Sequence, residues 1–91
     1  MVTQRCVVRG RVQGVGFRWF VTRNAADLGV RGTVRNQGDG SVEAVLQADA
    51  PEPVESLIAR LRSGPAAARV EGVDCETVSD EIRFERFEVS R

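Results

Sequence analysis

A glycine-rich segment followed directly by an arginine is the part of this sequence best suited to bind an anion. Gly14 and Gly16 come just before the expected start of a helix, and Arg18 lies in its first turn. Glycine adopts backbone conformations that other residues resist. A helix N-terminus presents unpaired amide groups and the positive end of the helix dipole, and a guanidinium can hold two phosphate oxygens at once. The candidate phosphate-binding loop is therefore Gln13, Gly14, Val15, Gly16, Phe17 and Arg18.

Taken alone, this loop leaves other interpretations open. Many strand-to-helix turns contain two glycines and bind nothing. The segment also lacks the third glycine of a dinucleotide fingerprint and the Gly-Lys-Ser/Thr of a Walker loop. Asn36 is the second candidate site residue, although an asparagine before a turn usually serves the turn itself. We interpret Asp39 and Gly40 as structural residues of that turn.

Composition bounds the kind of protein to expect. The 91 residues and their 42% hydrophobic content suit one domain, residues 1–91, with one core. The 13 basic and 13 acidic residues balance, which argues against non-specific nucleic-acid binding. No apolar run approaches the roughly 20 residues that span a bilayer, and no signal peptide follows the first residues. We therefore expect a cytoplasmic protein without membrane or nucleic-acid partners.

The residues that usually hold metals or move protons are scarce. The sequence contains no histidine, so the commonest general base is missing. Its two cysteines, Cys6 and Cys75, lack the spacing of metal ligands, and we expect neither a metal nor a cofactor. We also expect both thiols to be free and non-catalytic in a reducing cytoplasm, although the strands that carry them would be neighbours.

Hydrophobic periodicity predicts the elements that position the two candidate sites. Alternation predicts strands, spacing of three and four predicts helices, and Gly and Pro mark their ends. We expect strands from Cys6 to Val12, Val30 to Asn36, Val42 to Ala48, Val70 to Val78 and Ile82 to Val89, and helices from Phe17 to Leu28 and from Pro51 to the Gly64-Pro65 stop. The alternation breaks near Gly72 and Arg86, which indicates bulges or misplaced boundaries there.

This order of elements predicts an α+β, ferredoxin-like βαββαβ sandwich with strand order 4-1-3-2 and an extra C-terminal strand. Right-handed crossovers put both helices on one face. The first two strands are then parallel and about 10 Å apart, with one strand between them. The glycine-rich loop and Asn36 therefore leave the sheet at the same edge, where their side chains could hold a small substrate between them.

The other face of the expected sheet carries a row of arginines. Arg9, Arg11, Arg31 and Arg35 share it, with Glu43 among them. A solvated, salt-bridged face is one interpretation, and an RNA-binding face is the other. The central strands offer no aromatic side chains for stacking on bases, which weakens the second interpretation.

The combined spacing resembles the acylphosphatase family. The stretches that carry the resemblance are Gly10-x-Val12-Gln13-Gly14-Val15-Gly16-Phe17-Arg18, then Ala25-x-x-Leu28-Gly29-x-x-Gly32-x-Val34-x-Asn36, then Asp39-Gly40-x-Val42-Glu43. The resemblance implies a metal-independent, monomeric hydrolase of acyl phosphates, with inorganic phosphate as product and inhibitor. It implies that Arg18 and the amides of residues 14–18 bind the phosphate, and that Asn36 orients the attacking water.

Three alternatives remain beside that expectation. The same module occurs within larger carbamoyl-transferring proteins, but because the chain holds this module alone we expect a free-standing enzyme. A non-catalytic anion-binding module would bind phosphate without turnover. An RNA-binding ferredoxin-like protein would bind RNA tightly and in a salt-dependent way.

Overall fold

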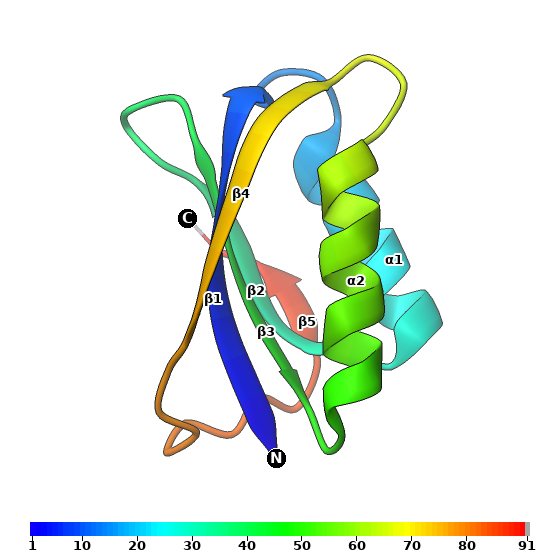
Figure 1. Cartoon of the computed structure of the whole chain (residues 1–91), viewed down its shortest axis with the longest axis vertical. Coiled ribbons are helices and arrows are strands. Elements are labelled where there is room, and N and C mark those ends of the chain that lie inside the picture. Colours follow the sequence, from blue (N-terminus) through cyan, green and yellow to red (C-terminus); the bar gives the residue numbers. More distant parts are fainter. Residues whose placement is uncertain (91) are drawn as a thin grey trace.

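The computed structural model describes residues 1–90, which form a five-stranded sheet with two helices packed on one face (Figure 1). The sheet order is β4-β1-β3-β2-β5; β5 runs parallel to β2, and the other neighbours are antiparallel. Across residues 1–90, no helix has the length and apolar character needed to span a membrane. The elements are β1 (Val2–Arg11), α1 (Phe17–Leu28), β2 (Arg31–Asn36), β3 (Val42–Ala48), α2 (Pro51–Ser63), β4 (Arg69–Thr77) and β5 (Phe87–Val89).

The core lies between the sheet and the two helices. Alternate residues of the central strand β3 point to the helices, and all four are buried: Val42, Ala44, Leu46 and Ala48. The helices bury one stripe each, made of Phe17, Val21 and Ala25 in α1 and of Val54, Leu57 and Leu61 in α2. Gly29 ends α1 in the left-handed conformation. The predicted fold class, helix faces and strand order are confirmed.

The last two strands differ from the prediction in detail. The register between β1 and β4 shifts at Arg9 and Gly10, which pair with Gly72 and Val70, so the predicted irregularity near Gly72 is a bulge. The predicted final strand from Ile82 to Val89 is wrong in its first half, because β5 begins only at Phe87.

The segment before β5 is a loop because it must travel from one edge of the sheet to the other (Figure 1). It is anchored on the way by the fully buried Gln47 of β3. The Gln47 amide nitrogen donates to the Ile82 carbonyl at 2.7 Å and to the Thr3 hydroxyl at 3.0 Å. Its amide oxygen accepts the Phe84 N–H at 2.9 Å. Backbone groups that would otherwise pair in a strand are thus satisfied by one side chain.

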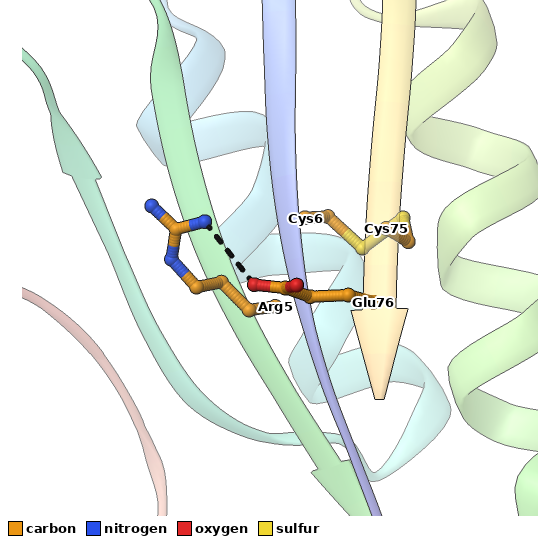
Figure 2. The surroundings of a disulfide bond; sticks show 4 residues. All are labelled: Arg5, Cys6, Cys75 and Glu76. Atoms are coloured by element: carbon orange, nitrogen blue, oxygen red, sulfur yellow. Dashed lines mark ion pairs between the residues drawn. A yellow bond between two sulfur atoms is a disulfide. The ribbon is translucent and has the colours of Figure 1, made fainter. Parts of the chain in front are cut away.

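The two cysteines form a disulfide, so the expectation of free thiols is wrong for this structure. Cys6 of β1 and Cys75 of β4 are direct partners across the antiparallel pair, with Cα atoms 4.1 Å apart (Figure 2). Such facing positions bring side chains together without any movement of the backbone. The neighbouring cross-strand pair, Arg5 and Glu76, forms an ion pair at 3.6 Å beside it.

The face of the sheet opposite the helices is a network of ion pairs. Glu43, which is only 9% exposed, accepts the Arg5 guanidinium at 2.6 Å and the Arg35 guanidinium at 3.0 Å. Arg9 pairs with Asp39 at 3.5 Å. Arg31 pairs with Asp49 at 3.1 Å. Because these arginines are engaged by carboxylates of the same chain, the arrangement favours the salt-bridged interpretation over an RNA-binding face.

Candidate active site

The loop between β1 and α1 has the backbone shape of an anion cradle. Gly14 and Gly16 have φ angles of 74° and 79°, and no residue other than glycine has a positive φ in residues 1–90. The sign of φ therefore alternates from Gly14 to Phe17, which turns successive amides toward a common side. Gly16 is the N-cap of α1, and no side chain caps that end. The first amides of the helix thus have no intrahelical partner.

This loop opens into a pocket of about 400 Å³ at one end of the sheet. Its lining combines the loop, the first turns of α1, the end of β2 and the end of β5. The lining residues are Val12, Gly14, Gly16, Phe17, Arg18, Trp19, Thr22, Asn36 and Val89. The predicted convergence of the loop and Asn36 at one edge is thereby found, although the chemical roles of these residues stay predictions.

Arg18 supplies the charge of the pocket. It is exposed in the first turn of α1, and among residues 1–90 no carboxylate lies within ion-pair distance of it. No acidic residue appears in the lining either. A free guanidinium beside unpaired amides makes the pocket attractive to a multiply charged oxyanion.

Asn36 supplies an unsatisfied acceptor. It is the last residue of β2, and its Oδ1 atom is buried without a hydrogen-bond partner. Within residues 1–90 it is the only buried side-chain polar atom left in this state. An unpaired buried carbonyl costs about 1–3 kcal/mol, so the state of this oxygen, in a residue that lines the pocket, calls for a physical explanation.

Gln13 was predicted as part of the phosphate loop, but its side chain points elsewhere. Its amide nitrogen donates to the Gln37 carbonyl at 2.7 Å and to the Ser41 carbonyl at 2.9 Å. Both amide protons are used, so the side chain cannot donate to a phosphate. Gln13 instead ties the loop after β1 to the turn that follows Asn36. Val15 packs on the core rather than lining the pocket.

The turn after Asn36 is self-sufficient in hydrogen bonds. Asp39 Oδ1 accepts the Ser41 hydroxyl at 2.6 Å and the Ser41 backbone N–H at 2.9 Å. These two bonds, with the nearby Arg9 guanidinium, lower the pKa of Asp39 below its ordinary value of 3.8. The interpretation of Asp39 as a structural residue agrees with this geometry.

Two exposed apolar residues of the pocket were not predicted from the sequence. Trp19 follows Arg18 on α1 and is 64% exposed, and Val89 of β5 is 45% exposed. Trp19 could have been noticed as a large aromatic next to the candidate arginine. Val89 carries no such signal, because its place beside the site depends on the parallel pairing of β5 with β2.

The chain has relatives among known proteins. Residues 4–89 match the family model described as Acylphosphatase. The chain is 51% identical over 78 residues to an acylphosphatase of Nitrobacter hamburgensis, covering 86% of this chain and 78% of that one. It is 47% identical over 90 residues to an acylphosphatase of Lactobacillus gasseri, covering 98% of each. The crystal structure of acylphosphatase from Bacillus subtilis superposes with a TM-score of 0.95 at 30% identity over the whole of both chains. The chain therefore belongs to the acylphosphatase family.

Proposed function

We propose that this protein hydrolyses the bond between the carboxylate and the phosphate of an acyl phosphate, releasing a carboxylate and inorganic phosphate. Family membership supports the reaction. The observation that supports the site is that Asn36, whose side-chain oxygen is buried without a partner, lines the same pocket as the uncapped end of α1. The Asn36 oxygen suits a hydrogen-bond donor such as water, and the end of α1 suits an anion such as a phosphoryl group. Water and the acyl phosphate are the two reactants of this hydrolysis.

The phosphoryl group would lie against the loop. The amides of residues 14–18 and the Arg18 guanidinium would hold its oxygens and neutralise charge as it redistributes in the transition state. The amide donors are fixed before the substrate arrives, because the glycine conformations and the helix start define them. Little reorganisation is then needed at the moment of reaction.

Asn36 would hold the attacking water. A rotation of the side chain that turns Oδ1 toward the pocket would let this oxygen accept one O–H of the water, which leaves an oxygen lone pair free to attack phosphorus. The new P–O bond forms as the bond from phosphorus to the carboxylate oxygen breaks, and the electron pair leaves on the carboxylate. Correct positioning is the main requirement, since an acyl phosphate is already activated.

The water proton would pass to a phosphate oxygen, because no acidic residue or histidine lines the pocket. The leaving carboxylate is a weak base and needs no proton. Turnover would also need no metal: residues 1–90 contain no cluster of three or more His, Cys, Asp or Glu side chains able to hold one. Arg18 and the amides would supply the positive charge instead.

Kinetics of Arg18 and Asn36 variants on an aryl acyl phosphate test these roles, because binding and positioning leave different marks. Arg18→Gln should raise KM, weaken inhibition by phosphate and lower kcat together. Asn36→Ala should lower kcat by about 10²–10³, the usual scale for one positioned polar group, with phosphate inhibition near wild type.

Matched controls separate these effects from general damage. Arg62→Gln removes the same charge from an exposed site on α2, and Asn24→Ala removes a carboxamide that instead bonds the Phe20 carbonyl. Both should retain wild-type kinetics. If folded Arg18 and Asn36 variants keep full activity, this assignment of the site is wrong.

The oligomeric state and the cellular compartment of the enzyme are predictions. We propose a single-domain, monomeric enzyme of the cytoplasm that acts on small molecules. Gel filtration would test the monomer against the chain mass of 10.0 kDa. The Cys6–Cys75 disulfide bears on the compartment, since such bonds are rare in a reducing cytoplasm. Alkylation of thiols in intact cells, followed by mass spectrometry, would show whether the bond exists there.

A further inference from the structure

The pocket is larger and more apolar than a phosphate site requires. Its 400 Å³ lies within the roughly 300–1,000 Å³ of pockets that enclose whole small molecules. The polar part of the lining comes from the loop, Arg18, Thr22 and Asn36, and Trp19 of α1 and Val89 of β5 add exposed apolar surface to it. A ligand that fills this space has a charged end and an apolar end.

The apolar part of the pocket concentrates exposed hydrophobic surface. Residues 1–90 expose four large apolar side chains, and two of them, Trp19 and Val89, line this pocket. Single exposed apolar residues are ordinary, but neighbouring ones at the mouth of a pocket mark a binding surface. The other two, Met1 and Ile82, lie outside it.

Trp19 is restrained by a side-chain contact, and Val89 is held through its backbone. The Arg23 guanidinium lies 5.2 Å from the centre of the Trp19 ring, one helical turn further along α1, and Arg23 does not line the pocket. This cation–π contact restrains the indole. Val89 is fixed by the parallel pairing of β5 with Val34 of β2, where the Ser90 N–H donates to the Val34 carbonyl at 2.8 Å.

We propose that Trp19 and Val89 form the acyl-binding wall, and that they select acyl phosphates with an aromatic or bulky apolar acyl group over those with a small one. This rests on the proposed hydrolysis and adds the chemistry of the leaving carboxylate to it. With the phosphate on the loop and Arg18, the acyl group points out along the remaining lining. The loop, Arg18 and Asn36 then determine the reaction, and Trp19 and Val89 determine which acyl group is preferred.

The test compares kcat/KM for benzoyl phosphate and acetyl phosphate in the full chain. Wild type should prefer benzoyl phosphate. Trp19→Ala should lower the benzoyl-to-acetyl ratio about tenfold, the scale of losing apolar contact in a specificity pocket. Trp19→Phe should retain most of the ratio. Val89→Thr, which keeps the shape but replaces one methyl group with a hydroxyl, should lower it several-fold. The inhibition constant of inorganic phosphate should stay near wild type in all three variants.

Ile82→Ala is the matched control, because Ile82 is 68% exposed and outside the pocket, and only its backbone carbonyl bonds Gln47. Its ratio should equal that of wild type. If folded Trp19→Ala and Val89→Thr both keep the wild-type ratio, or lose both substrates equally, the acyl wall is refuted while the hydrolase remains. If wild type hydrolyses neither substrate, the proposed function itself fails.

Discussion

The side chain of Gln13 offers a direct test of how the fold holds the two halves of the site together. It bridges the loop after β1 and the turn after β2 through two hydrogen bonds, of 2.7 and 2.9 Å. The perturbation is Gln13→Ala, which removes both bonds and touches neither Arg18 nor Asn36. Loop and turn would then keep their own structure but lose their mutual tether.

The loss of stability in Gln13→Ala can be estimated from the hydrogen bonds that the Gln37 and Ser41 carbonyls retain. After the substitution the Gln37 carbonyl still accepts the Gly40 N–H at 3.2 Å, and the Ser41 carbonyl still accepts the Gln37 N–H at 2.8 Å. Neither is orphaned, so each lost bond costs only its net value of about 0.5–1.5 kcal/mol. The sum is about 2 kcal/mol, which lowers Tm by roughly 8–16 °C in a domain of this size.

Gln13→Ala should also lower kcat/KM, because the tether sets the distance between the phosphate cradle and Asn36. A shift of about 1 Å between the phosphate cradle and the water-holding residue costs about 10²-fold in rate, so we expect kcat/KM to fall by about tenfold to a hundredfold. The assay is benzoyl phosphate hydrolysis well below the Tm of the variant, with Tm measured separately. Gln13→Glu, equal in size but unable to donate when ionised, should be at least as damaging.

Gln4→Ala controls for the loss of a half-buried glutamine, because Gln4 is half-buried as Gln13 is but lies within β1, away from the loop and the turn. It should leave kcat/KM unchanged. If Gln13→Ala loses about 2 kcal/mol of stability but keeps the wild-type kcat/KM, the tether stabilises the fold without positioning the site, and the reasoning about coupled halves is refuted.

Three further predictions follow from single features. Reducing the disulfide between Cys6 and Cys75, which are 69 residues apart, should lower the free energy of unfolding by about 4 kcal/mol; urea titration with and without reductant measures this, and coincident curves would contradict it. The depressed pKa of Asp39 means that its contribution to stability is complete above pH 3.8 and is lost as pH falls through the lower folded pKa. The Tm difference between wild type and Asp39→Asn should therefore shrink below pH 3.8, and a gap that widens there would count against the assignment. Turnover should survive EDTA and be inhibited competitively by inorganic phosphate; activity that chelation abolishes and added metal restores would rule out the metal-free mechanism.

The sheet could be predicted from the sequence because its inward positions alternate cleanly. Val42, Ala44 and Leu46 define the central strand, and the handedness of the crossovers then leaves one strand order. The last strand could not be predicted as well. Its boundary depends on Gln47, whose hydrogen bonds to Ile82 and Phe84 reach 35 and 37 residues along the chain. No local pattern reports bonds of that range.

The disulfide shows where strand order alone is insufficient. That β1 and β4 are neighbours was predicted, but whether Cys6 faces Cys75 depends on the register between them. The bulge at Gly10 and Gly72 shifts that register by one residue along part of the pair. Since a one-residue slip sends side chains to the opposite face, the facing of the two thiols could be read only from the structure. The expected compartment favoured free thiols, whereas the structure has the Cys6–Cys75 disulfide.

Asn36 could be named from the sequence, but the choice between turn chemistry and a site role needed the structure. An asparagine that serves a turn bonds its own backbone a few residues on. Here other residues make the hydrogen bonds of the turn: Asp39 accepts from Ser41, and the Gln37 N–H donates to the Ser41 carbonyl. The turn therefore does not use the side chain of Asn36, which lines the same pocket as Arg18 and keeps its oxygen buried without a partner. The turn does not explain the cost of this unpaired oxygen. A rotation of the Asn36 side chain toward the pocket would let the oxygen hold a water beside a bound phosphoryl group, and that bond would remove the cost.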